Sequence, residues 1–318
     1  MGYTPPFTVT DRISTLCIEI AEMVGHLDAS SELSTDPVLH RELRIRTIHS
    51  SLAIENNQLS ERQVTALLDG KRVLGPAQDI MEVENAHRAY ALIDTLDPYD
   101  LADLLRAHGT MMAGLREDAG RFRDGNVGVY DGDRLIHAGT PAAYVPEVMA
   151  DLFSWLRSTE MHPLIASCVF HYEFEFIHPF SDGNGRTGRL WHTLLLSRWR
   201  RVLAWLPVES VILQRQSGYY AAINQANGEG ASTVFVEFML TVIRDAVAPY
   251  AVTSHAVGRA EADIVADLMR DAPTLTVKDI SERTGMPRRS VERLIARMKD
   301  NGLVRREGSS RSGRWVVS

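Results

Sequence analysis

The chain has 318 residues, of which 45% are hydrophobic and 24% are charged, and its formal net charge is −7. These values are typical of a globular protein with about two domains, and no apolar run reaches the roughly 18–20 residues that span a bilayer. The first residues, MGYTPPFTVTDR, match neither a secretory signal nor, with Pro6 at the sixth position, a myristoylation site. Cys17 and Cys168 are too few for a disulfide framework, so we expect buried thiols and a cytoplasmic location.

Helical periodicity dominates the first third of the chain. Apolar residues recur at three- and four-residue spacing from Ile13 to Leu27, behind the capping candidates Thr10 and Asp11. Asn56 and Asn57 then interrupt the pattern, and Ser60 starts it again. Further helices are expected over residues 37–54, 61–68, 80–93 and 98–112.

The segment 120–144 differs in kind, because it is rich in Gly, Asp and Asn. Short β-branched or aromatic patches at 127–130 and 134–137 flank the turn-forming residues 131–133, which predicts a small β-hairpin. Helices are expected again over residues 145–158, 163–177, 184–202, 217–225 and 233–247.

The carboxyl-terminal part is basic, and its composition changes near residues 250–259. Residues 270–318 contain 12 Lys and Arg and 6 Asp and Glu, which gives them a net charge of +6. The remaining residues, 1–269, contain 22 Lys and Arg and 35 Asp and Glu, which gives a net charge of −13. Helices expected over 261–271, 277–284 and 288–301 precede short strands at 303–306 and 314–317, which is the order of a winged helix-turn-helix. Such a basic module suits a polyanionic partner.

The segment 171–189, HYEFEFIHPFSDGNGRTGR, carries the chemistry. Pro179 disfavours the α conformation at His178, so the preceding helix should end there. Gly183 and Gly185 then permit positive φ and close approach at the start of the next helix, where N–H groups and the helix dipole attract anions.

The side chains around these glycines suit a nucleotide. Arg186 and Arg189 share one helix face and can grip phosphate oxygens. Asp182 is a hard oxygen ligand suited to Mg²⁺ on a polyphosphate. Histidine titrates near neutrality, so His178 can accept a hydroxyl proton.

Three other interpretations of this segment are weaker. GNGRTG matches the dinucleotide fingerprint G-x-G-x-x-G, but it follows a helix rather than a strand. His171, Glu175 and His178 have the spacing of a metal site, but Pro179 and the lack of a third imidazole argue against one, and His171 is expected in the core. An ordinary helix–loop–helix would leave the combination of His, Asp, Gly and Arg unexplained.

HPFSDGNGRTGR resembles the Fic family signature H-P-F-x-x-G-N-G-R-x-x-R at every fixed position. The resemblance covers roughly residues 35–247: IENNQL and EVENAHRAY look like the amino-terminal part of the family, and SGYYAAINQAN looks like its carboxyl-terminal part. It implies a mainly α protein, in which a Fic-type helical bundle with a small β-hairpin flap precedes a winged helix-turn-helix. Three domains are expected. Residues 1–95 form a helical region that carries an inhibitory motif, residues 96–250 form the catalytic core, and residues 251–318 form the winged helix-turn-helix domain.

The resemblance also implies a role for each site residue in the transfer of AMP from ATP to a Tyr, Ser or Thr hydroxyl of a target protein, the chain itself included. His178 would be the catalytic base, and Asp182 would hold Mg²⁺ between the α- and β-phosphates. Arg186 would bind the β-phosphate and Arg189 the γ-phosphate. Phe180 would anchor the loop in the core, and Gly183, Asn184 and Gly185 would supply the anion cradle. Tyr219, Tyr220 and Asn227 would line the adenine pocket, and simple core packing is the alternative for these three.

The sequence SLAIEN at residues 51–56 resembles the family's inhibitory motif, [S/T]-x-x-x-E-[G/N], with Ser51, Glu55 and Asn56 at its fixed positions. A carboxylate delivered to Arg189 would compete with the γ-phosphate for one guanidinium. Glu55 at the end of a solvated helix is the alternative. Glu55 could instead orient a water that removes AMP, and the sequence does not separate these roles.

The two flanking modules are less specific. The hairpin near residues 128–140 resembles the family's flap, which aligns a target segment by strand-like pairing. In the basic tail, the expected DNA contacts are Arg288, Arg289, Arg293 and Arg297 on the recognition helix, although winged modules also dock proteins. The alternative function is a DNA-binding regulator whose Fic-like domain only senses nucleotide. The target protein, the nucleotide donor and the oligomeric state, a homodimer included, stay open.

Overall fold

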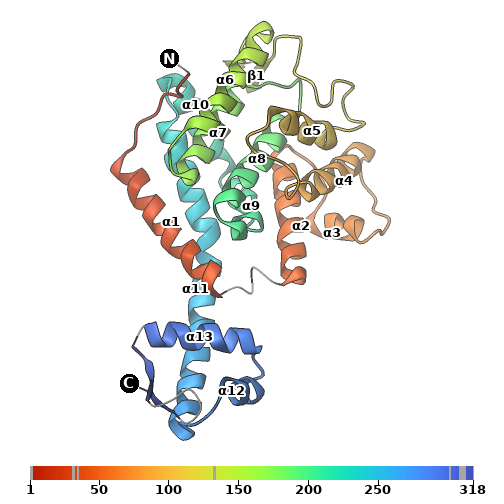
Figure 1. The fold of residues 1–318 in the computed structure, drawn as a ribbon. Helices are drawn as coiled ribbons and strands as arrows, with labels where there is room; N and C mark the ends of the chain where they lie inside the picture. The colour runs from red at the N-terminus through yellow and green to blue at the C-terminus, as the bar shows by residue number, and fades with distance from the viewer. Residues whose placement is uncertain are drawn as a thin grey trace. The chain divides into compact units, whose positions relative to one another are not determined.

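The structure is a computed structural model that describes residues 3–30, 33, 36–131, 134–300, 302–307 and 313–317. It is mainly helical, as expected, and it divides into two compact units, Met1–Ala248 and Pro249–Ser318 (Figure 1). None of the helices in the described part of the chain combines the length and the apolar character needed to cross a membrane.

The first unit is a helical bundle. Its first half contains α1 (Asp11–Ser30), α2 (Pro37–Ile54), α3 (Glu61–Leu68), α4 (Ala77–Ala91) and α5 (Leu101–Met111). Its second half contains α6 (Val145–Ser158), α7 (Pro163–Ile177), α8 (Asn184–Trp199), α9 (Val208–Gln214), α10 (Gln216–Glu229) and the start of α11 (Thr233–Asp271), with 3₁₀ turns η1 (Ala142–Tyr144) and η2 (Arg201–Ala204). Asp36 caps α2 through Val38 and Leu39, and Ser60 and Gln63 form a capping box on α3.

The centre of this unit is the pair α7 and α8, which lie side by side. Nearly every residue of both helices is buried, as expected of a helix that is covered on all sides. Phe170, Phe174 and Trp191 are fully buried there; Phe170 and Trp191 pack with Phe153 of α6, and Phe174 stacks on Phe170. The α7–α8 connection is therefore held on a rigid base.

The predicted hairpin is present as β1 (Gly128–Asp131) and β2 (Arg134–Ala138). The strands pair antiparallel, with Gly128 opposite Ala138 and Asp131 opposite Arg134, and a bulge lies between Val129 and Tyr130. Two of the expected turn residues, Gly132 and Asp133, lie outside the described residues.

The second unit has the elements of a winged helix. After α11 come α12 (Val277–Thr284), α13 (Arg288–Asp300), β3 (Val304–Glu307) and β4 (Arg314–Val317), and the two strands pair antiparallel. The predicted core residues of α13, Val291, Leu294, Ile295 and Met298, are buried. Trp315 of β4 closes this core, and its indole donates to the Leu275 carbonyl at 2.9 Å.

The structure corrects the predicted helices at two helix ends and adds one helix. The helix expected over 184–202 ends at Trp199, because Arg200 is extended and a 3₁₀ turn follows. The helix expected to end at Val247 continues as α11 to Asp271, through Pro249, because the change in composition near residue 250 marks a change of charge rather than a helix terminus. The short helix α9 has no cap signal and was not predicted.

Candidate active site

The loop between α7 and α8 is made by two residues with positive φ. The helix α7 ends at His178, as the following Pro179 predicts, and His178 takes the left-handed conformation, at φ 53° and ψ 62°. Gly183 precedes α8 at φ 77°, and an added Cβ there would lie 2.5 Å from the Met112 sulfur. The loop therefore turns sharply, and the N–H groups of the first turn of α8 face outward without intrahelical acceptors.

The loop is braced from inside. The Asn184 amide accepts from the Phe180 N–H and donates to the Phe180 carbonyl, both at 2.9 Å. Phe180 is fully buried and stacks on the His108 ring at a centroid distance of 3.6 Å. In the structure the side chains of Phe180 and Asn184 thus shape the loop.

His108 of α5 is a second brace. Its Nδ1 accepts from the Gly120 N–H at 2.9 Å, so its Nε2 carries the hydrogen and donates to the Asp182 carbonyl at 3.0 Å. Burial lowers the pKa of His108 to about 4, which keeps the ring neutral in this role.

His178 is positioned by hydrogen bonds that its backbone accepts. The guanidinium of Arg123 donates to the His178 carbonyl at 2.7 Å, and it also donates to the carbonyls of Gly125 and Thr140, at either end of the hairpin. On the ring, Nδ1 lies 3.4 Å from the Glu175 carbonyl, which can only accept. This contact favours the tautomer with hydrogen on Nδ1 and leaves Nε2 as the basic nitrogen.

Arg186 is held between two carboxylates. Its Nη1 donates to Glu82 of α4 at 3.0 Å, and its Nη2 donates to Asp182 at 3.0 Å. Glu82 is buried, whereas the Asp182 side chain is 49% exposed. The guanidinium is therefore oriented by the buried acid, and its other edge faces the open side of the loop together with Asp182.

Arg189 contacts Ser51 and Glu55, the two side chains that the resemblance places beside it. Its Nε donates to the Ser51 hydroxyl at 3.0 Å, and its Nη2 donates to the Ser51 carbonyl at 2.9 Å and to Glu55 Oε1 at 2.7 Å. Burial alone would lower the pKa of Arg189, but the Glu55 carboxylate beside it raises that pKa above its usual range. Asn56 ends α2 in the left-handed region, at φ 66°.

Gly185 makes the contact between α2 and α8 possible. A Cβ at this position would lie 2.3 Å from Glu55 Oε1 and 2.9 Å from Arg189 Nη1. Glu55 therefore occupies the space immediately in front of the first turn of α8, between the glycine amide and the arginine.

Behind the loop lies a buried polar layer. His171 is fully buried, as predicted, and its Nε2 lies 3.1 Å from the Tyr219 hydroxyl and 3.8 Å from Glu175 Oε1. Burial raises the pKa of Glu175 to about 7, against the opposing effect of Arg189. Burial lowers the pKa of His171 well below its usual value. Burial thus disfavours the charged form of both side chains.

The three residues expected at the adenine lie in different surroundings. Tyr219 is buried and bonded to His171, which places it in the core. Asn227 accepts from the Tyr172 hydroxyl at 3.0 Å. Tyr220 is 42% exposed, and its hydroxyl lies 3.5 Å from the Ile54 carbonyl, at the end of α2 and next to Glu55.

A metal ion would depend on the nucleotide for most of its ligands. Within the described ranges, no group of three or more His, Cys, Asp and Glu side chains could hold a metal ion. The exposed carboxylate of Asp182 fits Mg²⁺ that is carried by a polyphosphate, because Mg²⁺ commonly takes one or two protein carboxylates and completes its shell with phosphate oxygens and water.

Sequence reasoning missed three of the residues that organise this site: Glu82, His108 and Arg123. Each lies more than 50 positions from its partner in the loop. The segment EVENAHRAY, which contains Glu82, was noted for its resemblance alone. No local pattern marks His108 or Arg123.

The second unit presents the expected basic face in part. Arg288, Arg289 and Arg293 of α13 are exposed, and Arg288 pairs with Glu292 at 3.4 Å. The side chain of Arg297 lies outside the described part of the structure. On the wing, Arg305 and Arg314 both bind Glu307, at 2.9 and 3.2 Å, so this carboxylate offsets part of the wing's positive charge.

Comparison with known families gives two matches. The Fic/DOC family model matches residues 98–196, and the MarR family model matches residues 257–314. A crystal structure of a Fic family protein from Desulfovibrio desulfuricans G20 is 44% identical, with a TM-score of 0.77, over 99% of this chain and 98% of that one. A fragment of Fic-1 from Caenorhabditis elegans, at 24% identity and a TM-score of 0.63, shares the fold over 77% of this chain and 74% of that one.

Similar proteins of longer length are also known. "Protein adenylyltransferase fic-1" of Caenorhabditis elegans is 29% identical over 70% of this chain and 44% of its own length. "Protein adenylyltransferase Fic" of Aedes aegypti is 30% identical over 69% of this chain and 47% of its own length. This chain thus spans less than half the length of these curated relatives.

Proposed function

This chain belongs to the Fic family, and from that membership and the geometry of its α7–α8 loop we propose that it is a protein adenylyltransferase. It would transfer AMP from ATP to the hydroxyl group of a Tyr, Ser or Thr residue in a target protein. The relatives that carry the name protein adenylyltransferase match across the residues of this loop.

The observation that carries this proposal is the arrangement of a base and two arginines around one helix start. His178 ends α7, Arg186 and Arg189 project from the first turns of α8, and the loop between them is fixed by internal hydrogen bonds. A helix N-terminus with two guanidinium groups suits a polyphosphate, and a pre-shaped site needs little reorganisation during phosphoryl chemistry.

The proposed reaction assigns one task to each group. Nε2 of His178 accepts the proton of the target hydroxyl while its oxygen attacks the α-phosphorus in line with the leaving pyrophosphate. Arg186 and the backbone amides of Gly183 to Gly185 hold the β-phosphate, and Arg189 holds the γ-phosphate. Mg²⁺ bound to Asp182 would neutralise phosphate charge when it is present.

The same geometry favours an autoinhibited ground state. Arg189 donates to both Ser51 and Glu55, so the γ-phosphate of a correctly placed ATP would have to replace the carboxylate. Glu55 is 32% exposed, which gives it room to leave. The alternative role of Glu55, orienting a water molecule that removes AMP, requires the same position of the carboxylate. Substitution of Glu55 tests this role as well.

The second unit is proposed to bind duplex DNA. Its MarR family match and the exposed arginines of α13 support this assignment, with the helix in the major groove and the wing along the phosphates.

The direct test is intact-mass and peptide mass spectrometry of the chain after incubation with ATP and MgCl₂. A mass increase of one AMP on a hydroxyl-bearing residue is expected, and His178→Ala should abolish it. Retention of bound ATP without any covalent product in both the wild-type chain and Glu55→Gly would support the alternative of a nucleotide-sensing regulator. A different added mass would identify a different donor.

A further inference from the structure

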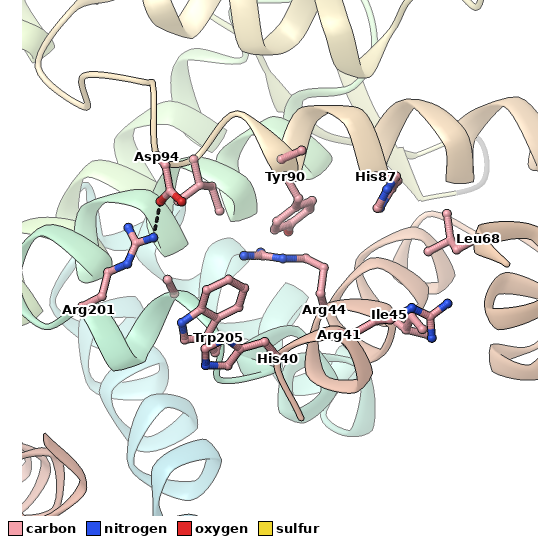
Figure 2. A pocket seen from close by; sticks show the side chains of 13 residues that line it. His40, Arg41, Arg44, Ile45, Leu68, His87, Tyr90, Asp94, Arg201 and Trp205 are labelled. Atoms are coloured by element: carbon pink, nitrogen blue, oxygen red, sulfur yellow. Dashed lines mark ion pairs between the residues drawn. The ribbon is translucent and has the colours of Figure 1, made fainter. Parts of the chain in front are cut away.

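A cavity of about 400 Å³ lies in the first unit, and none of its lining residues belongs to the loop from His178 to Arg189. It lies between the first half of α2, α4 and the η2 turn, and Figure 2 shows its wall. Three arginines line it, Arg41, Arg44 and Arg201, against one aspartate, Asp94. This excess of positive charge stands out because residues 1–269 carry a net charge of −13.

Arg44 is at the centre of this wall. Its guanidinium lies between the rings of Tyr90 and Trp205, with the central carbon 5.1 and 5.0 Å from their centroids (Figure 2). Its Nη1 is buried and has no hydrogen-bond partner among the residues that the structure describes. Burial lowers the pKa of Arg44, although nearby acidic groups oppose that shift. A buried cation with an unused donor is costly unless an anion joins it.

The nearest carboxylates do not fill this role. Glu209 accepts from the Tyr90 hydroxyl at 3.0 Å and from the Thr193 hydroxyl at 3.1 Å, and burial raises its pKa. Asp94 forms an ion pair with Arg201 on the far side of the cavity (Figure 2). Oε1 of Glu209 is therefore occupied, Oε2 of Glu209 has no hydrogen-bond partner among the described residues, and neither acid accepts a hydrogen bond from Arg44 Nη1.

The two other arginines line the same space, together with His87, whose lowered pKa leaves its ring uncharged near neutral pH. Burial lowers the pKa of His87, and the charges of Arg44 and Arg41 lower it further. Arg41 is about half exposed and pairs with Asp69 at its outer side. Figure 2 shows His87 and Arg41 on one side of Arg44 and Arg201 on the other, so an anion in the cavity would be met from both sides.

We propose that this cavity binds a compact anion that carries a phosphate group. Guanidinium groups bind phosphate in a two-pronged geometry, and a multiply charged anion matches a lining with two more positive than negative side chains. The volume lies at the small end of the range for ligand pockets, which fits inorganic phosphate, pyrophosphate or a nucleoside monophosphate. The site is distinct from the proposed ATP site, although α2 contributes to both.

The test uses the Trp205 indole as a local reporter. Trp205 is part of the cavity wall and stacks on His40 at 3.9 Å, so its ¹⁵N indole resonance, assigned with Trp205→Phe, reports on this site alone. Inorganic phosphate, pyrophosphate and AMP are titrated separately against the full chain, at constant ionic strength maintained with KCl. A saturable shift of this resonance is expected with at least one of them, and the order of affinities identifies the source of the phosphate.

Matched variants decide whether Arg44 is responsible. Arg44→Met should weaken the binding by roughly tenfold or more, the value of a lost charge-assisted hydrogen bond. Arg46 lies on the same helix but is exposed and outside the cavity, so Arg46→Gln should leave the binding unchanged. Arg189→Met removes a phosphate ligand of the proposed active site and should also leave the binding unchanged. If Arg44→Met does not fold, the half-exposed Arg201→Gln provides the test and should weaken the binding.

Two results would overturn the proposal. One is the absence of a saturable Trp205 shift with all three compounds. The other is unchanged affinity in a folded Arg44→Met, or in Arg201→Gln where Arg44→Met does not fold. Because the titrations involve no turnover, their outcome is independent of whether the chain transfers AMP.

Discussion

At the scale of single residues, Arg189 has two competing uses. In the structure its Nε and Nη2 donate to Ser51 and Glu55, and in the proposed reaction its guanidinium holds the γ-phosphate. The guanidinium is 1% exposed, so it cannot swing out to serve both partners. The Glu55 carboxylate, which is partly exposed, is the group that has to move.

Replacing Glu55 with Gly should therefore increase the rate of AMP transfer. The charge-assisted hydrogen bond to Arg189 is worth about 1.5–3 kcal/mol, which corresponds to an increase of roughly tenfold to a hundredfold. Auto-modification with labelled ATP measures this rate, and Glu55→Gly combined with His178→Ala is the inactive control. An unchanged rate in Glu55→Gly would remove the inhibitory role.

Arg123 is a positioning residue for the proposed base. It touches only backbone carbonyls, those of Ile177, His178, Gly125 and Thr140 among the contacts described, so its effect on the reaction would act through His178. Arg123→Gln should lower kcat by about tenfold to a hundredfold, as expected of a small displacement of a catalytic group, with little change in KM for ATP.

Two comparisons separate positioning by Arg123 from general damage. Arg121→Gln changes an exposed arginine two residues away and should have no effect. Arg123→Lys should recover part of kcat, because it restores one or two of the donors. Equal losses of kcat in Arg123→Gln and Arg121→Gln, or a rise in KM alone, would contradict the assignment.

His108 should make the first unit sensitive to acid. Its pKa is about 4 in the folded chain, below the usual value of 6.5, so between these values the unfolded chain binds a proton that the folded chain does not. Stability is therefore lost as the pH falls from about 6.5 to 4, by up to about 3 kcal/mol from this residue.

Chemical unfolding at pH 7 and pH 5 measures the effect of His108. His108→Gln keeps a donor for the Asp182 carbonyl but does not titrate, so its stability should fall less between these two pH values than that of the wild-type chain. Parallel losses in the two proteins would show that His108 contributes nothing to the pH dependence.

At the scale of elements, the wing of the second unit contains its own counter-charge. Arg305 of β3 and Arg314 of β4 meet on Glu307, and Arg306 lies over the Trp315 ring at 5.0 Å. The wing is therefore less positive than its sequence suggests. A DNA phosphate would compete with Glu307 for two guanidinium groups, as ATP would compete with Glu55 in the first unit.

Glu307→Gln should strengthen the binding of duplex DNA. Releasing Arg305 and Arg314 should increase the salt dependence of the binding constant by about one additional phosphate contact. Fluorescence anisotropy at several salt concentrations measures both quantities. Glu282→Gln, an exposed change of the same charge on α12, is the control, and an equal effect of both variants would assign the gain to net charge rather than to the wing.

At the scale of the whole molecule, the proposed chemistry belongs to one unit and the proposed DNA contacts to the other. Every residue assigned to the reaction and to its inhibition lies between Ser51 and Asn227, within the unit Met1–Ala248. A shortened chain that ends at Ala248 should therefore keep its rate of auto-modification within about twofold and lose its salt-sensitive DNA binding. Loss of the enzymatic activity in a folded chain of this length would show that the second unit contributes to the site.

Local sequence was sufficient where the decisive interactions are local. Pro179 ends α7 at the expected residue, Ser60 caps α3, and the apolar spacing of α13 gives the correct buried face. It was insufficient for α11, because the change in composition near residue 250 does not mark a helix end and the helix continues through Pro249. It was also insufficient for Tyr219, because spacing alone does not separate a pocket wall from the core.

The sequence by itself determined the mainly helical fold, the winged carboxyl-terminal module and the loop of His178, Gly183 and Arg186, because these depend on periodicity, caps and residues adjacent in the chain. Only the tertiary structure decided that Arg123 and His108 brace the loop, and that Arg44 lines a cavity while its Nη1 has no partner among the described residues. Contacts of this kind are fixed by how helices pack, and packing brings together residues whose separation in the sequence carries no periodic signal.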